Sequence, residues 1–131
     1  MNVRGLVLQG LVALVGLLMA TNAALWLVLP AKAAEALRMP LLAGPALSSQ
    51  MDIGAFFLAA ACFVVMALVT RERPWFMAAA VLALGAAAYR TAAFVFHGAP
   101  LLADMVGVEI VMGAILIIAS RVLAHRSESA G

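Results

Sequence analysis

Charged residues are scarce in this sequence. Its 131 residues include eight Lys or Arg and six Asp or Glu, which make up 11% of the chain, whereas about 25% is usual in soluble proteins. So few charges cannot cover the surface of a soluble fold that is 67% hydrophobic. The scarcity of charge therefore excludes a soluble domain and predicts an integral membrane protein, with the lipid bilayer as its main partner.

Cysteine is nearly absent, because the chain contains only Cys62. One cysteine excludes an intrachain disulfide and leaves no thiolate spacing for a metal site, so we expect neither a metal nor another cofactor. We expect Cys62 itself to be a packing residue. The net charge is +2, but the basic residues are spread between the apolar stretches. Without a basic patch, we expect no nucleic-acid partner.

Four stretches are apolar and long enough to cross a bilayer, which takes about 20 residues in a helix. They cover residues 6–29, 51–69, 75–96 and 101–123, and we expect Ser48 and Ser49 to cap the second. The first is apolar for too long to be a cleaved signal sequence, so we expect it to be retained. We therefore predict one all-α domain over residues 1–131, an integral membrane four-helix bundle.

The basic residues predict its orientation, because cytoplasmic loops carry an excess of Lys and Arg. With four spans both termini lie on one side, which then holds Arg4, Arg71, Arg73, Arg121 and Arg126. The other side holds only Lys32 and Arg38. We therefore predict cytoplasmic termini in the inner (plasma) membrane of a bacterium, with Trp75 at the inner interface and Trp26 at the outer one.

The connection between the first two spans, residues 30–50, is the only sizeable loop. Within residues 31–39, Lys32, Glu35 and Arg38 recur every three residues among Ala and Leu, which is typical of a short helix at the membrane surface. Pro30 would begin this helix and Pro40 would end it. A simple connector is the alternative.

Small residues are concentrated in the third span, where Ala fills positions 78–80, 86–88 and 92–93. Small faces let helices approach closely within lipid, so we expect a compact bundle with the third helix at its centre. General alanine richness of the chain is the alternative explanation. Similar notches are expected in the first and fourth spans at Gly10, Gly16, Gly107 and Gly113.

The most informative polar residues within the apolar spans are Asn22, Asp52, Arg90 and Glu109. A charge at mid-membrane costs about 2.5–3.5 kcal/mol on insertion scales, so such residues are candidates for a functional site. At about 1.5 Å of rise per residue, Asn22, Arg90 and Glu109 all lie about 10–12 Å below the outer ends of their helices. Asp52 lies above them. We therefore predict a polar layer in the outer half of the bundle.

Helical phase adds peripheral candidates. Arg90 and His97 are seven residues apart and would line one cavity wall, with Phe94 between them on the same flank. Asp104 and Glu109 point about 140° apart, so one would face the bundle while the other contacts a different helix or the headgroups. We expect the deeper Glu109 to face inward. Gln50, Tyr89, Thr91 and Asp104 are close in sequence to the polar layer and are further candidates to join it.

Two interpretations of the polar layer stay open. In one, Arg90 and Glu109 form a buried ion pair that holds the helix register, and Asn22 satisfies their leftover donors. In the other, the layer is an outward-opening pocket that binds a small polar or amphipathic ligand, or performs proton chemistry on it. His97, at the membrane edge, is expected to be a loop residue and not a catalyst.

Short motifs are spread over nearly the whole chain. They are Asn22, the opening Asp52-Ile53-Gly54-Ala55-Phe56-Phe57-Leu58 of the second span, the pair Tyr89-Arg90, the turn His97-Gly98-Ala99-Pro100, and Glu109. In these motifs the chain resembles an uncharacterised family of small bacterial four-helix membrane proteins, number 4345 among the domains of unknown function. The family often has Pro after its first-helix Asn, where this chain has Ala23. The resemblance implies the four-helix fold and singles out Arg90 and Glu109, but it implies no activity.

Three functions fit these residues. The first is a ligand-binding or accessory module whose polar layer takes a lipid, a small amphipathic ligand, or a helix of a partner membrane protein or second copy. The second is an enzyme doing isomerase-like acid–base chemistry on a lipid-soluble substrate, with Glu109 or Asp52 as acid or base and Arg90 stabilising negative charge. The third is a proton-coupled transporter acting as a dimer. We favour the first, which is not an enzyme.

Overall fold

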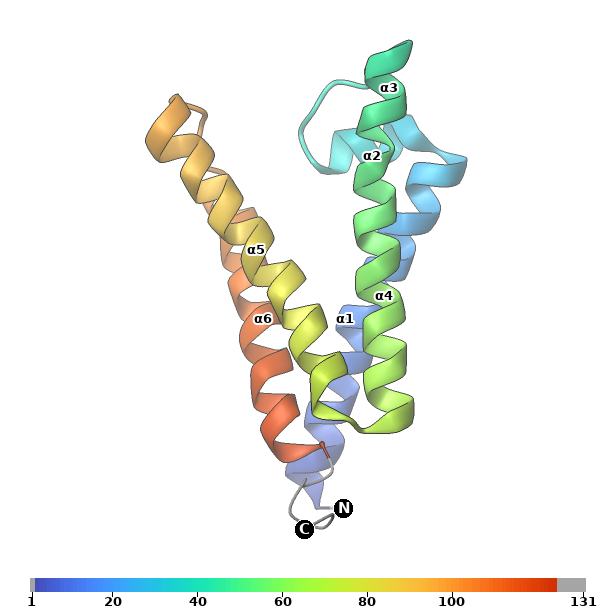
Figure 1. The fold of residues 1–131 in the computed structure, drawn as a ribbon, viewed down its shortest axis with the longest axis vertical. Helices are drawn as coiled ribbons and strands as arrows, with labels where there is room; N and C mark the ends of the chain where they lie inside the picture. Colours follow the sequence, from blue (N-terminus) through green and yellow to red (C-terminus); the bar gives the residue numbers. More distant parts are fainter. Residues whose placement is uncertain (1, 125–131) are drawn as a thin grey trace.

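The computed structural model describes residues 2–124, and this part of the chain contains helices and turns but no strand. The four long helices are α1 (Val3–Val28), α4 (Asp52–Thr70), α5 (Arg73–His97) and α6 (Ala103–Val122) (Figure 1). The short helices α2 (Pro30–Ala36) and α3 (Pro45–Gln50) lie between α1 and α4. Four spans are long and apolar enough to cross a membrane, so the all-α prediction is confirmed. The tail from Arg126 to Ser129 lies outside the described residues.

The second span begins earlier than expected. α3 starts at Pro45, directly after Gly44 with its positive φ of 62°, and α3 leads into α4 through Met51, which keeps helical angles. Residues 45–70 thus form one apolar span. Proline suits the first helical position because its missing N–H would have no partner there. The prediction that Ser48 and Ser49 cap the span is wrong, because both lie inside α3.

α2 matches the predicted loop helix in part. It begins at Pro30, as expected, but it ends at Ala36 and does not continue to Pro40. Arg38 then adopts the left-handed conformation, with a φ of 57°, and the N–H of the next residue donates back to the carbonyl of Ala34. This closure is typical of helix C-termini. The chain therefore leaves the helix at Arg38, before the proline is reached.

Gln50 holds the segment that follows α2. Its side chain is buried, and its Oε1 accepts a hydrogen bond from the N–H of Leu42 at 2.9 Å. Its Nε2 donates to the carbonyl of Pro40, also at 2.9 Å. The expectation that Gln50 joins the polar layer is wrong, because both ends of its amide are used to hold Pro40 and Leu42 against the end of α3.

The long helices form two arms. α1 packs along α4, and α5 packs along α6; between the arms, α5 contacts α4 and α1 contacts α6. The prediction of a compact bundle with the third helix at its centre is wrong, because α5 lies at one side of the molecule (Figure 1). An alanine-rich helix allows close approach but does not select a partner, since it presents small residues on every side.

Glycines mark the close approaches within the arms. A Cβ added to Gly16 of α1 would lie 2.7 Å from Cγ1 of Val64 in α4, and one added to Gly54 would lie 2.8 Å from Cβ of Trp26. In the other arm, a Cβ on Gly113 would overlap the side chain of Leu84. The predicted notches at Gly16 and Gly113 are therefore close approaches. Those predicted at Gly10 and Gly107 are not, because an added Cβ at either position meets nothing within 4 Å.

The helices of the two arms pack against each other at one end only. A large core joins all four long helices near the end where α1 begins and α6 ends, which we call the closed end. A small core of Trp26, Ala33 and Ala34 packs α2 against the α1–α4 arm alone. The arms separate toward this second end, the open end (Figure 1). The fully buried side chains of the large core include Val12, Val64, Phe76 and Leu116.

Large apolar side chains cover the outside of the long helices, including Leu17, Val69 and Val81, each more than 60% exposed. A surface of this kind suits lipid and not water. Cys62 is also exposed, on α4, so the prediction that it is a packing residue is wrong. The prediction of Trp26 as an interfacial anchor is wrong too, because α2 and α4 bury it completely.

Candidate functional site

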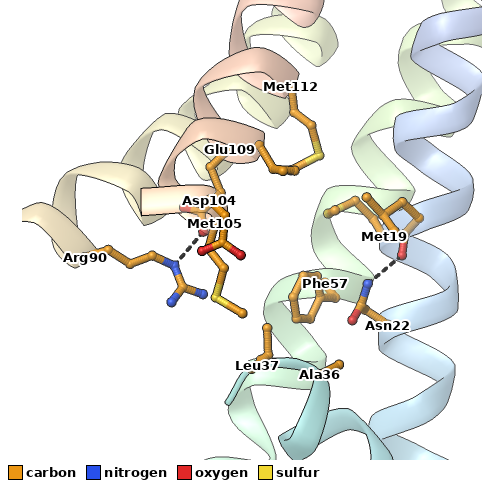
Figure 2. Close-up of a pocket in the computed structure, with 12 residues that line it drawn as sticks. Met19, Asn22, Ala36, Leu37, Phe57, Arg90, Asp104, Met105, Glu109 and Met112 are labelled. Carbon is orange, nitrogen blue, oxygen red and sulfur yellow. Dashed lines mark hydrogen bonds and ion pairs between the residues drawn. The ribbon is translucent and has the colours of Figure 1, made fainter. Parts of the chain in front are cut away.

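A chamber of about 290 Å³ lies between the two arms. Figure 2 shows Arg90 and Glu109 on the side of the α5–α6 arm, with Asn22 and Phe57 opposite them on the α1–α4 arm. Leu37, just after α2, lies on the open-end side. The three polar residues predicted at one depth, Asn22, Arg90 and Glu109, therefore line one cavity.

Arg90 and Glu109 form an ion pair across the α5–α6 arm. Nε of Arg90 donates to Oε1 of Glu109 at 2.5 Å, and the side chains are 29% and 11% exposed. Only this one N–H of the guanidinium has an acceptor among residues 2–124. The second carboxylate oxygen, Oε2, is buried and has no hydrogen-bond partner in the same range. The pair thus leaves guanidinium donors and a buried carboxylate acceptor unused on two residues that line the chamber.

Asn22 lines the chamber but does not join this ion pair. Its Nδ2 donates to the carbonyl of Leu18, one turn earlier in α1, at 2.9 Å. The expectation that Asn22 satisfies leftover groups of Arg90 and Glu109 is therefore wrong. The reason is that the arms have separated at this level, which places Asn22 on the opposite wall (Figure 2).

A second ion pair connects the arms at the open end. Nη1 and Nη2 of Arg38 donate to the two carboxylate oxygens of Asp104 at 3.0 and 2.5 Å. Both side chains are more than half exposed. Asp104 thus contacts a different element from Glu109, as helical phase predicted. Sequence reasoning did not identify Arg38 as part of the site, because its side chain comes from a loop and meets Asp104 only through the left-handed turn after α2.

Asp52, the fourth predicted residue, is at the start of α4 and is exposed. It lines a neighbouring cavity of about 620 Å³, together with Arg38 and Arg90. Arg90, Leu37 and Phe57 line this cavity as well as the chamber. Asp52 is therefore near the site without belonging to the chamber.

Of the peripheral candidates, Tyr89 and His97 line neither cavity, whereas Asp104 lines the chamber. Tyr89 is 82% exposed, and His97 is exposed at the end of α5. The prediction that His97 shares a cavity wall with Arg90 is wrong, because α5 has moved away from the other arm at that level (Figure 1). Thr91 donates to the carbonyl of Ala87 in its own helix at 2.9 Å and lines a groove elsewhere on α5.

Methionines make up part of the apolar chamber wall. Met19 comes from α1, and Met105 and Met112 come from α6 (Figure 2). Methionine is flexible and polarizable, so it adapts to ligands of irregular shape. Sequence reasoning missed these residues, because nothing distinguishes them from the other apolar residues of a span.

Among residues 2–124, no group of three or more His, Cys, Asp or Glu side chains lies close enough to hold a metal ion.

No family model matches the chain, and neither the curated proteins nor the solved structures include a significant match. The resemblance to the uncharacterised four-helix family therefore stays a prediction.

Proposed function

We propose that this protein is a multi-pass protein of a bacterial inner membrane that binds a lipid or small amphipathic molecule in the chamber. The observation that carries the proposal is the unused oxygen of Glu109. A buried polar atom without a partner costs about 1–3 kcal/mol, and here the atom belongs to Glu109, a residue that lines the cavity beside Arg90. A ligand that pairs with this oxygen would remove that cost.

The geometry of the two ion pairs supports binding over a purely structural role. Arg and a carboxylate commonly form two parallel hydrogen bonds, and the exposed pair Arg38–Asp104 has this arrangement. The buried pair Arg90–Glu109, where pairing would stabilise most, has a single bond through Nε. A pair that served only to hold helix register would use its remaining donors and its second oxygen. Arg90 and Glu109 leave them free at the chamber.

The rest of the chamber suits the apolar part of such a molecule. Phe57 and the methionines Met19, Met105 and Met112 surround the ion pair. A small number of polar groups in a mostly apolar cavity is the usual composition of a ligand site. Entry between the separated arms would let a molecule reach the chamber from within the membrane.

The proposed orientation places the closed end in the cytoplasm. Arg4, Arg71, Arg73 and Arg121 belong to that end, and Lys32 and Arg38 belong to the open end. By the distribution of basic residues, the chamber would then lie in the outer half of the membrane. A partner membrane protein or a second copy would be an accessory to this site.

The test is to identify what co-purifies with the protein. We expect mass spectrometry after mild native extraction to find a defined amphipathic molecule at near-stoichiometric amount. Glu109→Gln should reduce its occupancy at least about fivefold, the lower end of one lost buried hydrogen bond. Glu72→Gln, a matched change at the closed end, should leave occupancy unchanged. Equal occupancy in both variants, or only bulk lipid in all samples, would refute the proposal.

Acid–base catalysis on a lipid-soluble substrate is the second candidate, and the same oxygen favours it. Glu109 Oε2 is free to take a proton, and the terminal nitrogens of Arg90 would stabilise the negative charge that develops. A catalyst would exchange a C–H proton of the co-purified molecule for deuterium in heavy water. Exchange that is fast with the unaltered protein and lost in Glu109→Gln would favour the enzyme over the binding module.

A further inference from the structure

We infer that the chamber selects an uncharged amphipathic molecule whose polar end carries a hydrogen-bond donor beside a carbonyl acceptor, as in a primary carboxamide. This inference rests on the proposed binding function and names its ligand class. Glu109 Oε2 is a buried acceptor without a partner on a residue that lines the chamber, and the terminal nitrogens of Arg90 are donors without acceptors. A polar end that both donates and accepts is the complement of this pair.

The charges around the chamber argue against an ionic headgroup. Arg90 is paired with Glu109, and Arg38 is paired with Asp104. Asp52 adds a further carboxylate in the neighbouring cavity. The two cavities are thus lined by two arginines and three carboxylates, so no positive charge is left over for a phosphate or carboxylate ligand.

A cationic headgroup is disfavoured for a different reason. Arg90 lines both cavities, so a quaternary ammonium placed against Glu109 would lie beside a guanidinium. It would also have no N–H to give to Oε2. An uncharged donor avoids both problems, because it satisfies the oxygen without repulsion from Arg90.

The size of the chamber admits a headgroup with the first part of an alkyl chain. Its volume of about 290 Å³ is roughly ten times the share of one water molecule in the liquid, about 30 Å³. Phe57 and Met105 offer apolar contacts beside the polar pair. The remainder of a longer chain would extend between the arms.

The test is a series of probes with the same twelve-carbon chain and different heads. Dodecanamide donates and accepts, methyl dodecanoate only accepts, dodecyl phosphate is anionic, and dodecyltrimethylammonium is cationic. Binding is measured with the full-length protein in lipid nanodiscs, by competition with the co-purified molecule or by thermal stabilisation. We expect dodecanamide to bind at least about tenfold more tightly than each of the others, which is the effect of one hydrogen bond to a buried charged group.

Glu109→Gln sharpens the test. The amide oxygen of the new side chain would keep the bond from Nε of Arg90, which turns its NH₂ toward the position of Oε2. The variant would then present donors only, so the preference for dodecanamide over the methyl ester should fall below about threefold. Glu72→Gln should keep the full preference. The ranking on the unaltered protein decides the question even where Glu109→Gln fails to fold.

The outcomes separate the ligand class from the binding function. Tightest binding of dodecyl phosphate or of the ammonium probe would overturn the inferred class and leave ligand binding in place. Equal binding of all four probes would overturn it too, because the chain alone would then be recognised. No saturable binding of any probe, combined with no co-purified molecule, would refute the proposed function as well.

Discussion

The two ion pairs of the site should differ sharply in their contributions to stability. Removing the arginine of the inner pair, by Arg90→Met, leaves the carboxylate of Glu109 without a counter-charge on a side chain that is 11% exposed. Breaking a buried pair in this way costs about 3–5 kcal/mol. Glu109→Gln should cost less, about 1.5–3 kcal/mol, because the amide oxygen still accepts from Nε and the Arg90 side chain is 29% exposed.

Double-mutant cycles measure the two couplings. We expect the combined change Arg90→Met with Glu109→Gln to cost less than the sum of the single changes, by about 1–3 kcal/mol. The matched cycle Arg38→Met with Asp104→Asn should give a coupling below about 1 kcal/mol, because those side chains are 53% and 59% exposed.

The free energy of unfolding is accessible by titrating SDS into mixed lipid–detergent micelles. Fluorescence of Trp26 is a suitable probe, because this side chain is fully buried against α2 and its emission will shift when the fold opens. Two results would show that burial does not control the strength of these ion pairs. One is that Arg90→Met lowers the free energy of unfolding no more than Glu109→Gln does. The other is that the coupling free energy of the exposed pair equals that of the inner pair.

Three further predictions test the fold. Gly54→Ala should destabilise by about 1–3 kcal/mol, because its new Cβ meets the buried Trp26, whereas Gly107→Ala, in open space, should not destabilise; equal effects in SDS unfolding would contradict the close approach of α1 and α4. Gln50→Leu should speed hydrogen exchange at the N–H of Leu42 by about tenfold or more, with Ser49→Ala as the unaffected control; unchanged exchange would show that Gln50 does not hold this segment. In a Cys62→Ala background, a membrane-impermeant maleimide should label Lys32→Cys in intact cells and Arg71→Cys only after permeabilisation; the reverse pattern would invert the proposed topology.

The positions of the helices could be predicted from the sequence, but which helices pack together could not. Apolar runs of about 20 residues have few alternatives to a helix in lipid, so the four spans follow from composition, apart from the early start of the second at Pro45. Composition does not predict which helices pack together, because the spans are apolar on all sides. Gly10 and Gly16 look equivalent in the sequence, but only Gly16 meets the other helix of its arm, at Val64.

The candidate site was predictable to a similar extent. Depth alone brought Asn22, Arg90 and Glu109 to one level, and the structure places all three on one cavity. Contacts that depend on a local turn of the backbone could not be predicted from the sequence. Arg38 meets Asp104, 66 residues away, only because the chain turns through a left-handed conformation after α2.

The separation of the arms makes the protein a wedge. In a bilayer it would occupy more area in the leaflet at the open end than in the leaflet at the closed end. Lipids that exert different lateral pressures in the two leaflets would therefore change the angle between the arms. Membrane curvature and lipid shape would thereby change the width of the chamber through mechanical stress alone, without any molecule touching its polar groups.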